Sequence, residues 1–215
     1  MRTLIFIAAL FMCATTAKAQ TSITKIIETI PREIIPYIND NSREEISKFT
    51  DENDSLSVKN ELNGNTTIRK RNDDYVRIDL NESSSLQIKL LPVNDTTQII
   101  CMVRTMKSPL PESEIAFYST EWEKLENGYG LPDIHNADSI MAGFTCKPDT
   151  MTETKFEELR KYIEPIMVYA GFDDKGQALT FSINIPFTTK DMRNEVKAII
   201  KQKSFKWSNG FFKEC

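Results

Sequence analysis

The strongest constraint on the fold is a regular alternation of apolar and polar residues in the middle of the chain. Residues 75–80 place Val, Ile or Leu at every second position, and residues 86–90 repeat the pattern. Such alternation is typical of strands with one buried and one solvent-facing side. The turn signal Asn94-Asp95 precedes a strand expected at 98–106, and another is expected at 113–120. Because the connections are short, we expect neighbouring strands to pair in an antiparallel sheet.

The second half of the chain repeats this pattern on a smaller scale. Strands are expected at 166–172 and 178–185 around a hairpin turn, with a last strand and turn at 205–212. Residues 126–154 are rich in Gly, Pro and small polar residues, and we interpret them as an ordered connecting segment. The sequence therefore predicts an α+β fold: a largely antiparallel β-sheet with helices packed on one side, in two related halves.

Helices are expected before the first strands and in the second half. An apolar face at helical spacing predicts a first helix, made by Ile23, Ile26, Ile27 and Ile30. Pro31 is expected to open a second short helix that carries Ile34, Ile35 and Ile38. Capping boxes predict three further helices, at Ser42 with Glu45, Thr154 with Glu157, and Thr188 with Asp191.

The first 19 residues have the features of a cleavable secretory signal. Arg2 is followed by an apolar run at 4–12 and then by Ala17-Lys18-Ala19, the small-x-small pattern that signal peptidase accepts. We expect cleavage between Ala19 and Gln20. The run is about half of the ~20 residues that span a bilayer, which disfavours a membrane anchor. Lipidation at Cys13 ranks lower, because a large Met12 precedes it.

This leader divides the chain into parts. We expect a signal peptide (1–19), N-terminal helices with antiparallel strands (20–125), the connecting segment (126–154), and a helix, hairpin, helix and terminal strand (155–215) in the same globule. The processed chain of 196 residues holds 25 basic and 31 acidic residues, a net charge of -6. These charges are interspersed, which argues against nucleic acid and anionic membranes as partners. No later segment is apolar for long enough to span a membrane.

The cysteines do not form a disulfide framework. Three remain after cleavage, and they are widely spaced. Cys101 lies in an apolar strand and is expected to be a buried thiol. In an oxidising compartment one bridge is available, and Cys146 with Cys215 is the candidate pair.

Four segments together resemble a known family. They are residues 79–91, 94–101, 117–122 and 205–207. In these the chain is similar to a family of exported Bacteroidales proteins catalogued only as a domain of unknown function. The resemblance covers most of the processed chain and implies a lineage and an export route, with no established activity and no catalytic residues to transfer.

That lineage implies one modification. Exported proteins of the phylum are often O-glycosylated at Asp, then Ser or Thr, then an aliphatic residue, Met or Thr. Four triplets in expected loops or turns fit this pattern, with the hydroxyl groups of Ser55, Thr96, Ser139 and Thr150. The competing interpretation is ordinary turn chemistry.

Catalytic signals are weak. His135 is the one histidine, and its neighbours Asp138 and Ser139 are too close in sequence for a triad. Glu121 and Glu123 beside Trp122 are a conceivable carboxylate pair for glycoside hydrolysis, although solvated surface charge is the better interpretation.

The C-terminal aromatic residues allow two interpretations. Phe205, Trp207, Phe211 and Phe212 form either a platform that stacks on sugars or, as is more usual, the core of a terminal strand. We predict no metal and no cofactor, since ligand spacing and phosphate-binding glycine loops are missing from the sequence.

These observations favour a non-catalytic binding or scaffolding protein of the cell envelope, located in the periplasm, at the outer membrane or outside the cell. Its partner would be an envelope protein or a glycan. The alternative is a carboxylate-dependent hydrolase of glycans or peptides. A third hypothesis is an inhibitor or assembly helper that offers a sheet edge to its partner.

Overall fold

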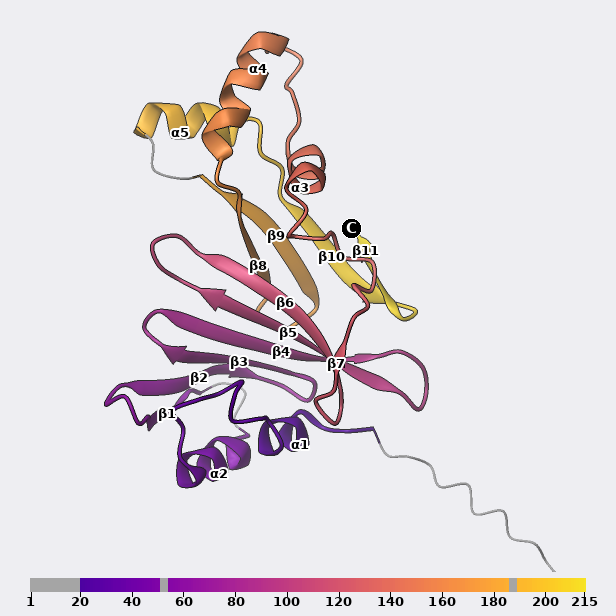
Figure 1. Cartoon of the computed structure of the whole chain (residues 1–215). Helices are drawn as coiled ribbons and strands as arrows, with labels where there is room; N and C mark the ends of the chain where they lie inside the picture. Colours follow the sequence, from indigo (N-terminus) through magenta and orange to yellow (C-terminus); the bar gives the residue numbers. More distant parts are fainter. Residues whose placement is uncertain (1–19, 51–53, 186–188) are drawn as a thin grey trace, which may run out of the picture.

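The larger of two sheets is a seven-stranded antiparallel meander. The computed structural model describes residues 20–50, 54–185 and 189–215, and Figure 1 shows their arrangement. Each strand of this sheet pairs with its neighbours in sequence. The strands are β1 (Leu56–Lys59), β2 (Asn65–Arg71), β3 (Tyr75–Asn81), β4 (Ser84–Pro92), β5 (Gln98–Met106), β6 (Glu112–Ser119) and β7 (Lys124–Leu125).

The smaller sheet has the order β11-β10-β9-β8 and is also antiparallel. Its strands are β8 (Met167–Phe172), β9 (Ala178–Asn184), β10 (Lys203–Ser208) and β11 (Phe211–Glu214). Asn209 and Gly210, both at positive φ, form the tight turn between the last two strands. The predicted α+β fold with antiparallel sheets in two halves is confirmed.

The helices are short and lie outside the sheets. They are α1 (Ile23–Glu28), α2 (Asp40–Lys48), α3 (Ala137–Phe144), α4 (Glu153–Arg160), the 3-10 turn η1 (Lys161–Ile163) and α5 (Lys190–Lys197). In Figure 1, α1 and α2 lie against one face of the larger sheet, and α3, α4 and α5 gather at the far end of the smaller sheet. No helix in the described ranges is long and apolar enough to cross a membrane.

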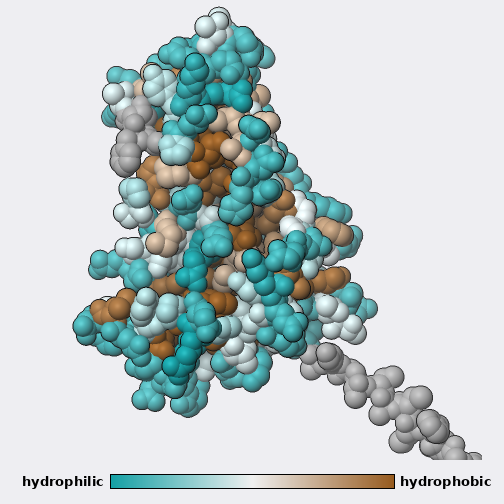
Figure 2. All heavy atoms as spheres, in the orientation of Figure 1, coloured by the Kyte–Doolittle hydropathy of each residue, from teal (hydrophilic) through white to brown (hydrophobic). Residues whose placement is uncertain are grey.

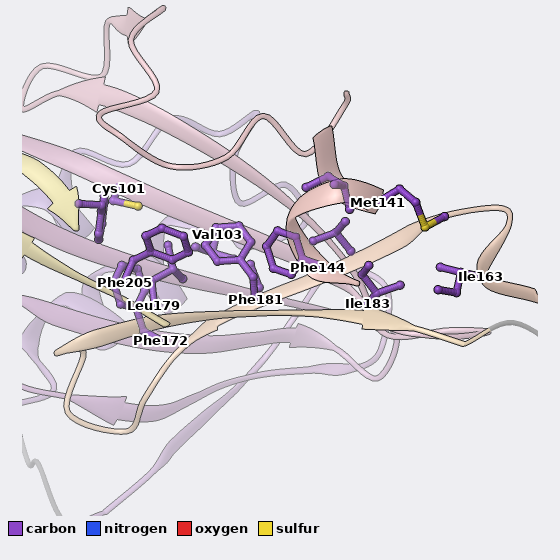
Figure 3. Close-up of a cluster of buried hydrophobic side chains, with 14 of the residues drawn as sticks. Cys101, Val103, Met141, Phe144, Ile163, Phe172, Leu179, Phe181, Ile183 and Phe205 are labelled. Atoms are coloured by element: carbon purple, nitrogen blue, oxygen red, sulfur yellow. The ribbon is translucent and has the colours of Figure 1, made fainter. Parts of the chain in front are cut away.

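Strand alternation sends the side chains of the larger sheet into two separate cores. Ile78, Ile88 and Ile100 pack on the face that α1 and α2 cover. Cys101 and Val103 pack on the opposite face, toward the smaller sheet. Figure 3 shows this second core, where side chains from the larger sheet, α3 and the smaller sheet meet. Burial of an aliphatic or aromatic side chain contributes roughly 1.5–3 kcal/mol, so both faces of the larger sheet stabilise the fold.

The smaller sheet is attached through its edge strand β8, which crosses the face of the larger sheet. Gln87 on β4 exchanges two hydrogen bonds with the main chain of Phe172: Oε1 accepts from N at 2.8 Å, and Nε2 donates to O at 3.4 Å. Ser113 on β6 does the same for Ala170, through Oγ at 3.0 Å from both N and O. These side chains supply the partners that a neighbouring strand gives elsewhere, so this edge is covered.

The predicted second helix after Pro31 is wrong. Residues 31–37 form turns, although Ile34, Ile35 and Ile38 are buried as expected. The reason is Arg43 of α2, whose guanidinium donates to the carbonyl oxygens of Ile30, Ile35 and Ile38 at 2.9–3.3 Å. It satisfies carbonyl groups that would otherwise need helical partners. Burial and the neighbouring Arg32 lower the pKa of Arg43.

The helices α2, α4 and α5 form, but other residues cap them. The N-caps are Asn39, Thr152 and Thr189, each accepting from the main-chain N–H three residues on. The predicted caps at Ser42 and Thr154 are therefore wrong, because the first turn begins earlier than the capping-box pattern indicates. Thr188 lies outside the described residues.

Sequence patterns missed β1 and β2. Residues 65–71 contain one apolar side chain, Ile68, and a β-bulge follows it. On this strand Arg71 is buried, and it donates to carbonyl oxygens of Ile46, Ser47 and Phe49 at the end of α2. A charged residue thus takes the place of a core position, which alternation of apolar residues does not reveal.

Candidate functional site

A polar groove of about 820 Å³ lies at one end of the larger sheet. It opens on the face that carries the smaller sheet, between the β1–β2 and β3–β4 turns. Figure 2 shows hydrophilic residues over most of one face of the molecule, with apolar residues gathered toward the middle. The groove is lined by Asn60, Leu62, Asn63, Gly64, Asn65, Thr67, Arg69, Asp79, Asn81, Glu82, Ser83 and Lys107. Its volume falls in the range of about 300–1,000 Å³ typical of small-molecule sites.

A carboxylate held by two cations forms the floor of the groove. Asp79 Oδ2 accepts from Arg69 Nε at 2.7 Å, and Oδ1 accepts from Lys107 Nζ at 2.8 Å. Burial alone would raise the pKa of Asp79, but the hydrogen bonds and charges of Lys107 and Arg69 outweigh it and lower that pKa. Asp79 is therefore ionised near neutral pH and acts as an acceptor of hydrogen bonds.

Amide side chains line the walls of the groove, and they differ in whether they are free to contact a ligand. Asn60 is buried, and its Oδ1 accepts from the N–H groups of Leu62 and Gly64 at 3.1 and 3.0 Å. It therefore shapes the β1–β2 turn. Asn63 and Asn65 are exposed on the same turn and strand, so their amides can meet a ligand.

A smaller hollow of about 70 Å³ adjoins the groove and shares Asn60, Leu62 and Asn81 with it. Tyr37 lines this hollow with 49% of its surface exposed and a φ of 72°. A bulky side chain rarely adopts this conformation. The main-chain oxygen of Tyr37 accepts from the N–H of Glu61 at 2.7 Å, which ties the residue to the β1–β2 turn.

Comparison with known proteins places the chain in a family. The family model described as "Protein of unknown function (DUF3256)" matches residues 14–212. The chain belongs to this family. No curated protein matches the sequence of this DUF3256 member.

A solved structure shares the fold. The structure of a domain of an uncharacterized protein from Porphyromonas gingivalis W83 superposes with a TM-score of 0.73 at 16% identity. The match covers 90% of the DUF3256 chain and 97% of the other chain. At this identity the likeness concerns the fold alone.

The predicted carboxylate pair does not converge in one hollow. Glu121 and Glu123 are exposed on either side of Trp122, in the turn between β6 and β7. Glu121 borders a different hollow of about 500 Å³, where its carboxylate accepts from Thr120 Oγ1 at 2.9 Å. Trp122 packs against Tyr118 and donates through Nε1 to Thr29 Oγ1 at 3.3 Å.

The C-terminal aromatic residues are divided between core and surface. Phe205 and Phe212 are buried, Phe211 is exposed, and Trp207 is half-buried with Nε1 donating to the carbonyl oxygen of Pro92 at 2.7 Å. They do not form one exposed platform, and the core interpretation holds for the two buried rings.

His135 is an exposed turn residue in the loop before α3. Its main-chain N–H donates to Asp133 Oδ1 at 3.0 Å. Across the described ranges, no three His, Cys, Asp or Glu side chains gather as metal ligands do.

The remaining candidates are surface groups. Ser55, Thr96, Ser139 and Thr150 are all exposed, although Ser139 lies in α3 instead of the expected loop. Cys146 and Cys215 are exposed free thiols, and Cys101 is buried. The pairing of the two exposed cysteines stays a prediction. Ala19 lies outside the described residues, and Gln20 is the first residue within them.

Sequence reasoning did not find the groove. Its residues come from the β1–β2 turn, from β2, from the end of β3, from the β3–β4 turn and from the residue after β5. One signal was available: Asn60, Asn63 and Asn65 cluster within one short turn. Such a cluster is also ordinary turn chemistry, so it would not have indicated a site alone.

Proposed function

We propose that this protein is an exported, non-catalytic binding protein of the cell envelope, and that the groove at the end of the larger sheet is its binding site. Export rests on the leader pattern at 1–19 and the cleavage expected between Ala19 and Gln20. Determination of the N-terminal residue of the native protein tests this part. A chain that begins at Gln20 supports it, and one that begins at Met1 contradicts it.

The observation that carries the binding function is the placement of Asp79 between Arg69 and Lys107 in the groove. A hydrolase of the carboxylate type needs an acid that holds a proton near neutral pH. Arg69 and Lys107 lower the pKa of Asp79, which makes this carboxyl a poor proton donor. The same arrangement fixes three polar groups in the groove with little loss of entropy on binding, which favours recognition.

Cosedimentation with isolated envelope material tests the binding site. We compare the wild-type protein with Lys107→Met, which removes one groove cation, and with Lys161→Met, which removes an exposed lysine of η1. We expect weaker cosedimentation for Lys107→Met, unchanged cosedimentation for Lys161→Met, and no soluble products. Equal binding by both variants would contradict the site, and release of fragments by the wild-type protein would contradict the non-catalytic function.

A further inference from the structure

The groove and the hollow beside it have the chemistry of a sugar-binding site. We propose that the ligand is a neutral oligosaccharide and that Tyr37 is the platform on which one sugar ring stacks. This inference rests on the proposed function and adds the class of ligand.

Tyr37 is held in place although its backbone is strained. Its segment is fixed by Arg43, which donates to Ile35 and Ile38 oxygens, and by Arg104, whose Nη2 donates to the oxygen of Ile34 at 2.6 Å. Residues with a strained φ persist where the surrounding structure determines them, and they gather at functional sites. The result is a half-exposed aromatic ring at the end of the sheet, next to the residues Asn60, Leu62 and Asn81 that its hollow shares with the groove.

An exposed ring beside polar groups suits a sugar. One face of a pyranose ring presents C–H groups that pack on an aromatic ring, and its hydroxyl groups both donate and accept hydrogen bonds. The groove offers matching groups. Arg69 uses Nε for Asp79 and keeps its two Nη groups as donors, and Asn63 and Asn65 supply exposed amides.

The balance of charge favours a neutral ligand. The charged groups that line the groove are Arg69, Lys107, Asp79 and Glu82, which sum to zero. Asp79 is already paired with both cations. A strongly anionic or cationic ligand would have to compete with these contacts. The charge of the groove is therefore not complementary to such a ligand.

The position of the groove favours a glycan over an extended peptide. Peptides that bind sheets commonly add to an open edge through main-chain hydrogen bonds. The floor of this groove is the side-chain face of β2 and β3, and each of these strands is paired on both edges. Recognition there must come from side chains, as it does for sugars.

Isothermal titration of the purified protein tests the ligand class. The probes are the neutral trisaccharides maltotriose, cellotriose, mannotriose and chitotriose, the acidic trigalacturonate, and an uncharged acetylated hexapeptide. We expect at least one neutral trisaccharide to bind. We expect Tyr37→Ala to weaken that binding roughly five- to tenfold, because an aromatic stacking contact is lost.

Three variants separate stacking from folding. Tyr37→Phe keeps the ring and is expected to bind like the wild-type protein. Tyr37→Gly suits the positive φ and removes the ring, so it should fold normally and bind as weakly as Tyr37→Ala. Tyr162→Ala, at an exposed tyrosine in η1, should leave binding unchanged.

The outcomes distinguish this inference from the function on which it rests. Binding of the peptide or trigalacturonate alone, binding of no probe, or full affinity in Tyr37→Gly would overturn the glycan inference. If Lys107→Met still loses envelope binding in those cases, the groove remains a binding site for another ligand. If Lys107→Met binds the envelope normally, the proposed site fails together with the glycan inference.

Discussion

Gln87 and Phe172 join the two sheets through a side chain that imitates a strand. The Gln87 carboxamide accepts from Phe172 N at 2.8 Å and donates to Phe172 O at 3.4 Å, and all these groups are buried. The edge of β8 is thus closed by a residue of β4, and Ser113 of β6 repeats the arrangement at Ala170. The third hypothesis, a protein that offers an open sheet edge, gains no support from this strand.

We predict that Gln87→Leu destabilises the protein by about 1–3 kcal/mol, because it leaves buried main-chain groups of Phe172 without partners. Urea denaturation measures the change. Gln177→Leu, at an exposed glutamine of the β8–β9 turn, is the control and should change stability by less than about 0.5 kcal/mol. Equal stability of the two variants would show that the side-chain pairing contributes nothing.

Replacement of two glycines by alanine should change the stability of the protein in opposite directions. Gly176 has a φ of 69°, and an added Cβ would lie 2.6 Å from Cγ of the Tyr75 ring, so Gly176→Ala should cost about 2–4 kcal/mol. Gly143 lies in α3 with nothing within 4 Å of an added Cβ. Gly143→Ala should stabilise by about 0.5–1 kcal/mol through helix propensity. Thermal denaturation measures both, and the same sign for both changes would contradict the packing described here.

Asp79 should make stability depend on pH. Because its folded-state pKa is lowered, its contribution is present above the unfolded pKa of about 3.9 and is lost as pH falls through the folded value. Asp79→Asn should therefore destabilise the protein by about 1–2 kcal/mol at pH 7. The difference in free energy of unfolding between the variant and the wild-type protein should become smaller below about pH 4. A difference in free energy of unfolding that stays constant between pH 7 and pH 3 would show that Asp79 is not the titrating group.

The thiols should differ in reactivity. Burial raises the pKa of Cys101 and removes its access to reagents, whereas Cys146 and Cys215 are exposed. In the reduced protein, Cys146 and Cys215 should react with a chromogenic disulfide reagent in the native state, and Cys101 only after unfolding. Rapid reaction of Cys101 would contradict its burial. In the protein before reduction, failure of both exposed cysteines to react would indicate the bridge between them that the sequence suggested.

Patterns of neighbouring residues in the sequence predicted those elements whose formation depends mainly on neighbouring residues. Strands β3, β4 and β9 follow from apolar alternation and β5 from a continuous apolar run, although β3, β4 and β5 prove to be buried on both faces, where one solvent-facing side was expected. The turns at 31–37 could not be predicted, since the groups that satisfy them belong to Arg43 and Arg104, later in the chain. A short apolar segment after proline carries no sign of such distant partners.

The site was harder to predict from the sequence than the fold, for the same reason. The groove depends on Asp79 and Lys107. In the sequence, Asp79 is an ordinary polar residue of an alternating strand, and Lys107 is an ordinary residue that follows a strand. Asp79 meets Arg69 through the register of β2 with β3, and it meets Lys107 through the course of the chain after β5. Pairs of ordinary surface charges become a site only when strand order brings them together.

Chemical-shift mapping by NMR, during titration of the labelled protein with solubilised envelope polysaccharide, tests whether the groove is a non-catalytic binding site for a glycan. We expect the largest shifts on the backbone amides of Asn63, Asn65 and Arg69, with a smaller shift at Tyr37, and we expect the polysaccharide to keep its chain length. Shifts centred on the loop around His135, or a shortening of the polysaccharide, would contradict this expectation.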